Sequence, residues 1–138
     1  MNLRVIVIDD HTLFREGLEG LLTRRDIDVV ASVGDGEQGI QLAKELKPDI
    51  ILLDMRMPDI NGLGVLAKLN ETDLKMPISM LTTSSDERDL VEALRNGAKG
   101  YLLKDMEPDS LVVALRDIVS GKTVVAPALA PVLAKVVQ

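Results

Sequence analysis

Residues 3–10 read Leu3-Arg4-Val5-Ile6-Val7-Ile8-Asp9-Asp10, a short apolar run that ends in two acids. Residues 49–54 repeat the arrangement, because Ile50-Ile51-Leu52-Leu53 leads directly into Asp54. Two further apolar runs end in Thr82 and in Lys104. Short continuous apolar runs are typical of strands buried on both faces of a parallel sheet. The pattern predicts an α/β fold in which acids, a hydroxyl and an ammonium group follow successive strands.

Segments with helical spacing alternate with these runs, which is the order expected of a parallel sheet covered by helices on both faces. We expect strands at 3–9, 28–33, 49–53, 78–82 and 100–103. The helices are expected at 12–25, 36–46, 63–70, 108–121 and, starting at the Ser84 capping box, from 85 to about 95. Two capping-box spacings, Asp35 to Gln38 and Ser84 to Glu87, predict the starts of the second and fourth helices.

The residues after Gly121 carry a separate pattern. An apolar stripe at helical spacing is formed by Leu129, Val132, Leu133, Val136 and Val137. It predicts a sixth, amphipathic helix with little polar content. We expect this helix to pack against a partner.

Composition limits the functions that the chain can have. It has 138 residues, the size of one domain, and a formal net charge of −6, which disfavours a surface for nucleic-acid phosphates. The absence of cysteine excludes disulfides and thiolate chemistry. No apolar stretch approaches the roughly 20 residues of a membrane span, and no export signal is visible at the N-terminus, so we expect a cytoplasmic protein.

The chemistry at the ends of the strands follows from topology. In open α/β sheets, ligands bind beyond the carboxyl ends of the strands, where Asp9, Asp10, Asp54, Thr82 and Lys104 are predicted to meet. Clustered carboxylates repel one another unless a cation joins them, and Mg²⁺ prefers oxygen ligands of this kind. A carboxylate can also act as a nucleophile and form an aspartyl phosphate.

The isolated position of Asp54 makes it the better candidate for the nucleophile, while the adjacent pair Asp9 and Asp10 is suited to hold the cation. Lys104 and Thr82 would neutralise and hydrogen-bond phosphoryl oxygens. Taken one at a time, each of these residues is more simply a solvated loop or cap residue, but their joint occurrence favours a phosphoryl site. The one histidine, His11, is most simply an exposed side chain, with catalysis or phosphate carriage as the alternative.

Taken together, these residues resemble the receiver domain of two-component response regulators, over residues 3 to about 121. The resemblance implies a flavodoxin-like (CheY-like) doubly wound sheet of five parallel strands in the order 2-1-3-4-5, with five flanking helices and a C-terminal linker helix. Residues 1–121 would form the receiver domain. Residues 122–138 would form a linker toward a helix-turn-helix DNA-binding domain that is missing here.

The resemblance also assigns roles to individual residues. Asp54 would be the phosphoacceptor, and Mg²⁺ would be held by Asp9, Asp10, Asp54 and the main-chain carbonyl of Arg56. Thr82, Lys104 and Tyr101 match the switch hydroxyl, the phosphate-binding lysine and the rotating aromatic. Tyr101 is also simply explained as a half-buried packing residue. The loop after the phosphoacceptor strand is matched by Met57, Pro58 and Gly62.

A narrower resemblance points to NarL/FixJ-type regulators, a group that includes nitrate/nitrite regulators. It is carried by Asp9-Asp10-His11, by 36–40, by 100–108 and by 128–134. It implies a sensor histidine kinase as phosphoryl donor, a transcriptional output through the missing domain and possible homodimers through the face of the fourth helix, fifth strand and fifth helix. Direct binding of nucleic acid or membrane by this chain is not expected.

Two alternatives remain at this stage. An aspartate-nucleophile phosphatase could use similar residues, although such enzymes carry a second Asp two residues after the nucleophile, where this chain has Arg56. A stand-alone interaction module without DNA output is the other. We expect a signalling domain rather than an enzyme, with only self-directed phosphotransfer and autodephosphorylation.

Overall fold

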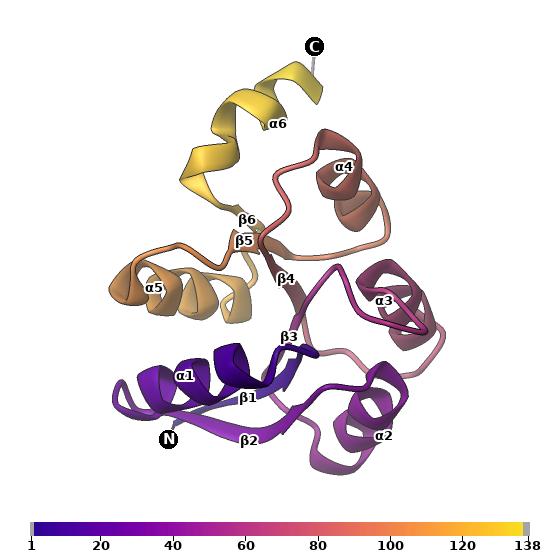
Figure 1. Cartoon of the computed structure of the whole chain (residues 1–138), viewed down its shortest axis with the longest axis vertical. Coiled ribbons are helices and arrows are strands. Elements are labelled where there is room, and N and C mark those ends of the chain that lie inside the picture. Colours follow the sequence, from indigo (N-terminus) through magenta and orange to yellow (C-terminus); the bar gives the residue numbers. More distant parts are fainter. Residues whose placement is uncertain (1, 137–138) are drawn as a thin grey trace.

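The computed structural model describes residues 2–136 and has three layers, with a central parallel sheet between two layers of helices (Figure 1). The strands are β1 (Leu3–Ile8), β2 (Ile27–Val33), β3 (Ile50–Leu53), β4 (Ile78–Thr82), β5 (Gly100–Leu103) and β6 (Val124–Val125). The helices are α1 (Thr12–Thr23), α2 (Gly36–Leu46), α3 (Gly62–Asn70), α4 (Glu87–Arg95), α5 (Pro108–Val119) and α6 (Ala130–Val136), with a 3₁₀ turn at Pro127–Leu129.

The order of the strands is β2-β1-β3-β4-β5-β6, and all neighbouring pairs are parallel. The first five strands confirm the predicted order. The sheet has a sixth strand, however, where five were expected. Strand β6 is two residues long and pairs Val124 with Gly100 and Val125 with Tyr101, so it covers the outer edge of β5.

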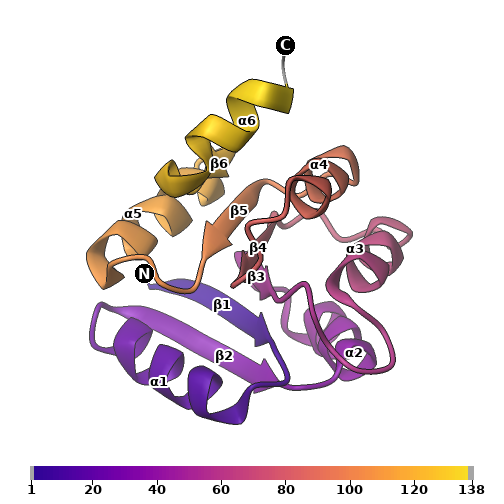
Figure 2. The same ribbon diagram turned by 45° about the horizontal axis from the view of Figure 1, so that its top comes forward.

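The two faces of the sheet carry separate cores because successive side chains of a strand point to opposite sides. On one side, α1 and α5 pack on Val5, Val7, Ile50 and Leu52. On the other side, α2, α3 and α4 pack on the alternate strand residues (Figures 1 and 2). The strands β3, β4 and β5 are buried along their whole length, which explains their unbroken apolar sequence.

The predicted helix starts were right for α2 and wrong for α4. The Asp35 side chain caps α2 by accepting a hydrogen bond from the Gln38 amide, at 3.3 Å. For α4 the cap is Asp86, which accepts from the Arg88 amide at 2.8 Å, and not Ser84. Ser84 instead lies in the loop before α4, where its hydroxyl bonds to Asp89.

The C-terminal segment lies against the same chain. Leu129 and Ala126 are almost fully buried in the core that also contains Tyr101 and the α4 residue Leu90, and Val132 packs on it. Helix α6 contacts α4 and extends away from the sheet (Figure 2). The predicted stripe therefore finds a partner within the chain as far as Val132, while Val137 lies outside the described residues.

Candidate functional site

Two neighbouring strands bring the first acids together. Strand β1 pairs with β3 in a register that sets Ile8 beside Leu53, and the Asp54 amide donates to the Ile8 carbonyl at 3.0 Å. Asp9 and Asp54 directly follow these strands, and their side chains are each only 3% exposed. Parallel pairing thus forces two buried carboxylates into one place, as the sequence predicted.

Lys104 supplies the opposite charge. It follows β5, its amide donates to the Thr82 carbonyl at 3.0 Å, and its side chain is only 9% exposed. The Nζ atom lies 2.7 Å from Asp9 Oδ2 and 3.3 Å from Asp54 Oδ2. A buried ammonium shared by two carboxylates compensates part of their repulsion.

Phe14 is a residue of this site that was not predicted from the sequence. The Lys104 Nζ atom lies 4.5 Å from the centre of the Phe14 ring, a cation–π contact. Phe14 belongs to α1, which starts just after the acid pair. The helical spacing of apolar residues in α1 predicts that Phe14 is buried, but it does not predict which group lies above its ring.

The pKa of Asp54 is raised above its ordinary value of 3.8. Burial is the largest cause, and the negative charge of Asp9 adds to it. The charge of Lys104 and hydrogen bonding from Thr82 and Lys104 oppose the shift. The ionised form of Asp54 is therefore disfavoured in this site, and an added positive charge would stabilise it.

The carboxylate cluster consists of Asp9, Asp10 and Asp54. Together with His11, these residues each offer a ligand atom, and the four atoms all lie within 4.8 Å of one another. Asp10 Oδ1 is buried and has no hydrogen-bond partner in the described part of the chain. Buried oxygens without donors are costly unless a cation or water joins them, so the residues present fit a hard divalent cation such as Mg²⁺.

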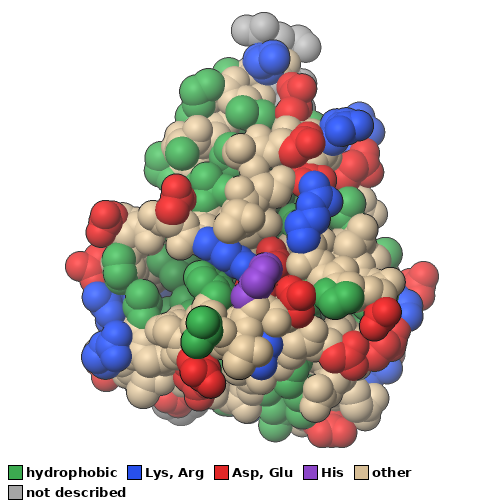
Figure 3. All heavy atoms as spheres, viewed as in Figure 1, with side chains coloured by type: hydrophobic (Ala, Val, Ile, Leu, Met, Phe, Trp, Pro, Cys, Tyr) green, Lys and Arg blue, Asp and Glu red, His purple; other side chains and the backbone are tan. Residues whose placement is uncertain are grey.

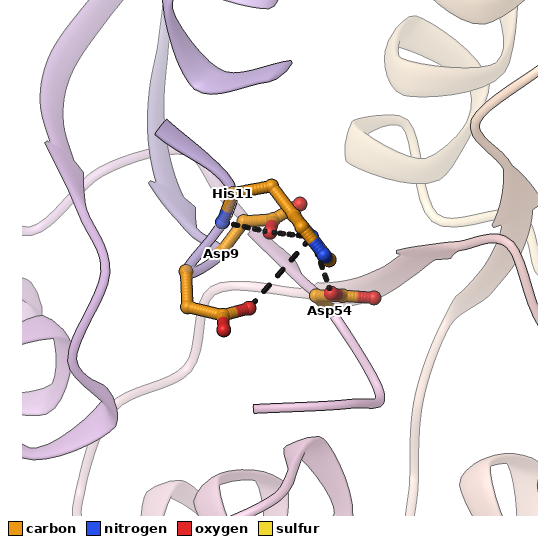
Figure 4. A group of neighbouring side chains, drawn as sticks. Asp9, His11 and Asp54 are labelled. Atoms are coloured by element: carbon orange, nitrogen blue, oxygen red, sulfur yellow. Dashed lines mark hydrogen bonds and ion pairs between the residues drawn. The ribbon is translucent and has the colours of Figure 1, made fainter. Parts of the chain in front are cut away.

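His11 faces the cluster. Its Nδ1 atom lies 3.0 Å from Asp9 Oδ1, 3.6 Å from Asp54 Oδ2 and 3.7 Å from Asp10 Oδ1 (Figure 4). Its side chain is 60% exposed, and the imidazole marks the site on the molecular surface (Figure 3). The simple interpretation of an exposed, uninvolved histidine is therefore incomplete, because one ring nitrogen contacts all three acids.

Thr82 and Tyr101 lie next to the site on the side of α4. Thr82 ends β4, is fully buried, and its Oγ1 accepts from the Ser84 amide at 3.2 Å. Tyr101 is also fully buried, not half-buried as expected, and its hydroxyl donates to the Ser84 carbonyl at 3.0 Å. Burial raises the pKa of Tyr101, so the phenol remains protonated and donates. Both side chains thus bond to Ser84 in the loop between β4 and α4.

Arg56 points to α4 and not into the carboxylate cluster. Its Nη2 atom lies 2.5 Å from Asp89 Oδ2, and the Ser84 hydroxyl donates to the same oxygen at 2.5 Å. Asp89 is 8% exposed and is a residue that the sequence analysis did not single out. The sequence offers one indication of its importance: Asp89 is an acid near the N-terminus of a predicted helix, where negative charge is favourable.

The loop between β3 and α3 explains the predicted Gly62. A Cβ atom there would collide with the Asp54 carbonyl oxygen and with the backbone of Met55, whereas the Gly62 amide donates to the Met55 carbonyl at 2.9 Å. Glycine therefore lets α3 start directly against the phosphoacceptor candidate. Met57 packs on the core, and the Pro58 carbonyl accepts from the Ile60 amide at 2.7 Å, so this loop folds back on itself.

Comparison with known proteins agrees with this geometry. The family described as response regulator receiver domain matches residues 5–116. The chain is 49% identical over 131 residues to the nitrate/nitrite response regulator protein NarL of Escherichia coli K12, covering 94% of this chain and 61% of that protein. It is 41% identical over 128 residues to the transcriptional regulatory protein LnrK of Bacillus subtilis, covering 92% of this chain and 58% of LnrK.

A similar fold has been solved. The crystal structure of a LuxR-family two-component response regulator from Aurantimonas matches with a TM-score of 0.92 and 28% identity, covering 100% of both chains. This chain spans about three-fifths of the length of the curated relatives. Among the described residues, no helix is long and apolar enough to cross a membrane. The chain belongs to the receiver domain family of two-component response regulators and is related to NarL.

Proposed function

We propose that this domain is switched by phosphorylation of Asp54, with a sensor histidine kinase as donor. The observation that carries the proposal is the buried Asp54 carboxylate, which lies 3.3 Å from the Lys104 ammonium and within the carboxylate cluster. A buried nucleophile beside a fixed cation needs little beyond position and charge to accept a phosphoryl group. The exchange is proposed to take place in the cytoplasm.

The proposed step transfers the phosphoryl group from the kinase histidine to Asp54. An Asp54 carboxylate oxygen forms a bond to phosphorus while the bond from phosphorus to the kinase histidine breaks, and the electron pair stays on the imidazole nitrogen. Lys104 then contacts a phosphoryl oxygen in place of part of its contact with Asp54. Thr82, at the end of β4, donates its hydroxyl to another phosphoryl oxygen.

We propose that Mg²⁺ would be held by Asp9, Asp10, Asp54 and the main-chain carbonyl of Arg56. When bound, the cation would neutralise charge on the phosphoryl oxygens and the acids. The raised pKa of Asp54 supports this assignment, because an ionised nucleophile at this buried position benefits from added positive charge. The buried, unpartnered Asp10 Oδ1 supports it independently.

The route from the site to the rest of the molecule is proposed to pass through Ser84. Thr82 and Tyr101 both bond to this residue, and the Tyr101 carbonyl accepts from the Ala126 amide in the C-terminal segment at 2.9 Å. Movement of Thr82 toward a phosphoryl group would therefore disturb α4 and the segment 122–136 together. Such a loop biased by local charge is a common form of switch.

The output is proposed to be transcriptional, through a DNA-binding domain joined to the segment 122–138, with residues 1–121 as the receiver. The length of the curated relatives and the regulatory names of NarL and LnrK support this. A nitrate or nitrite signal rests on the name of one relative. Homodimers through α4, β5 and α5 would require β6 and α6 to move, since these elements border β5 and α4.

A phosphatase function has less support. Phosphatases of the aspartate-nucleophile class place a second acid two residues after the nucleophile, and here Arg56 stands at that position with its guanidinium bonded to Asp89. We propose that turnover is limited to the domain's own phosphoryl group. Multiple turnover on phosphomonoesters would contradict this.

The test is intact-mass spectrometry after incubation with acetyl phosphate and Mg²⁺. We expect a single phosphoryl adduct on the unchanged protein and none on Asp54→Asn. Addition of EDTA before the donor should prevent the adduct. An adduct of equal yield on Asp54→Asn would overturn the assignment.

A further inference from the structure

The position of His11 is not explained by a phosphorylation site made only of acids and a lysine. Four groups of the site surround its Nδ1 atom, because the three acids lie at 3.0–3.7 Å and Lys104 Nζ lies at 3.2 Å. No other histidine occurs in the sequence. This nitrogen is therefore part of the same constellation as the predicted cation ligands.

The distances match those between atoms that share one ion. Donors that each lie about 2.1 Å from a cation are about 3.0 Å apart when adjacent in an octahedron and about 4.2 Å apart when opposite. The three separations of Nδ1 from the carboxylate oxygens, 3.0, 3.6 and 3.7 Å, fall between these limits. One ion could thus bridge the imidazole and the acids after the four ligand atoms, which lie within 4.8 Å of one another, have drawn together by a few tenths of an ångström.

The backbone holds the imidazole in this place. His11 is the N-cap residue of α1, and its amide donates to Asp9 Oδ1 at 2.9 Å, the same oxygen that Nδ1 contacts at 3.0 Å. The Nδ1 contact turns the ring toward the carboxylate cluster, on a short segment that joins β1 to α1 (Figure 4). Its outer side is open to solvent, which leaves a path for an ion.

Lys104 is the group that opposes a cation here. Its ammonium contacts both Asp9 and Asp54, and it lies close to Nδ1. It does not, however, reach Asp10 in any contact of the described residues, and Asp10 Oδ1 remains without a hydrogen bond. The Asp10 side of the cluster is therefore available to an ion, and binding there would require His11 Nδ1 to exchange its 3.2 Å contact with Lys104 for the ion.

We propose that His11 Nδ1 is a cation ligand that makes this site favour divalent transition metals over Mg²⁺. Imidazole suits Co²⁺, Ni²⁺ and Zn²⁺, whereas Mg²⁺ is bound through oxygen. The inference rests on the proposed cation site of the receiver domain and specifies which cations it takes. His11 is a specificity-determining residue of that site.

The experiment compares Co²⁺ and Mg²⁺ binding by calorimetric titration of the tag-free chain, without any phosphoryl donor. The main variant is His11→Asn, since Asn is a good N-cap residue and preserves the start of α1. We expect the ratio of Co²⁺ to Mg²⁺ affinity to fall about tenfold or more in this variant. Asp10→Asn is the control, and it should weaken binding of both ions.

A second readout follows the ring directly. Because the chain has one histidine, its imidazole protons give a single set of NMR signals, which bound Co²⁺ should shift or broaden strongly. An unchanged affinity ratio in His11→Asn, or unperturbed imidazole signals at saturating Co²⁺, would overturn the proposal. Equal gains in affinity for both ions in the variant would also overturn it, because His11 would then only block the site.

The two proposals can fail separately. Metal titration needs no phosphoryl transfer, so a changed affinity ratio stands even if Asp54 is never phosphorylated. Conversely, a phosphoryl adduct on Asp54 with Mg²⁺ stands even if the ratio does not change.

Discussion

At the scale of single residues, the site is a balance between burial and charge around Asp54. Burial and the nearby Asp9 raise its pKa, while Lys104 and Thr82 lower it. A side chain that is 3% exposed and ionisable is not explained by packing needs. It fits the proposed phosphorylation of this carboxylate beside a bound cation.

This balance predicts a pH-dependent stability. An acid whose pKa is raised on folding binds its proton more tightly in the folded state, so its carboxylate destabilises the folded state at pH values above the folded pKa. Asp54→Asn should therefore raise the melting temperature at pH 7 by a few degrees in EDTA. The gain should shrink as the pH falls through the folded pKa toward 3.8, the ordinary value. Thermal melts at pH 4 to 8 measure this, and a gain that does not vary with pH would contradict it.

Lys104 should control reactivity more than folding. We expect Lys104→Met, which removes the ammonium and its contact with Phe14 but keeps a flexible apolar side chain, to slow phosphorylation by acetyl phosphate about 100-fold, as loss of one charge-stabilising donor does in other sites. The matched control is Lys122→Met, since the Lys122 side chain is 69% exposed and has no contact with the carboxylate cluster among the described residues. Time courses by intact mass give both rates. Equal rates for the two variants would contradict the role of Lys104.

Replacement of Gly62 by alanine should destabilise the fold, whereas the same replacement at Gly17 should not. A Cβ at Gly62 meets the Asp54 carbonyl, so Gly62→Ala should cost roughly 1–3 kcal/mol of unfolding free energy. Gly17, in α1, has open space around the same atom, and Gly17→Ala should gain about 0.5–1 kcal/mol. Urea denaturation measures both changes. A Gly62→Ala variant as stable as the unchanged protein would show that the loop between β3 and α3 can move to make room for the methyl group, which would contradict the prediction.

Sequence reasoning placed Asp9, Asp54, Thr82 and Lys104 correctly because a parallel sheet brings the ends of its strands together regardless of detail. It did not find Phe14, Asp89 or the inward-facing His11. Those positions depend on side-chain directions set by tertiary contacts, which spacing along the chain does not encode.

At the scale of elements, the C-terminal segment is the part that differs most from expectation. It adds β6 to the edge of β5 and buries Leu129 beside α4. A two-residue strand has no periodic pattern of its own, so only pairing with β5 creates it. The strands and helices before it were predictable because their apolar patterns are long enough to identify. The start of α4 was not, since Ser84 and Asp86 are both acceptable cap residues and the helix uses the second.

This arrangement predicts that the segment stabilises the receiver fold. Leu129 is 2% exposed, so Leu129→Ala should lower the free energy of unfolding by about 2–4 kcal/mol. Leu13 is 85% exposed, and Leu13→Ala should change it by less than about 0.5 kcal/mol. Urea denaturation of both variants checks this. Equal effects of the two would mean that the segment does not pack on the receiver in solution.

At the scale of the whole molecule, one sheet joins the carboxylate cluster to the C-terminal segment. The carboxyl ends of β1 and β3 hold the carboxylate cluster, while β5 carries both Lys104 next to the cluster and the pairing with β6. Tyr101 lies within β5 and bonds through its hydroxyl to the loop before α4. We propose that phosphorylation of Asp54 is transmitted along these contacts to the C-terminal segment.

The most direct test of the account is to locate the phosphoryl group. After reaction with acetyl phosphate and Mg²⁺, borohydride reduction converts an aspartyl phosphate to homoserine, and peptide mass mapping identifies the residue. Phosphorylation of Asp54 predicts homoserine at position 54 alone, in the peptide that contains Leu53 and Met55. Modification at Asp9, Asp10 or His11, with Asp54 unchanged, would contradict it.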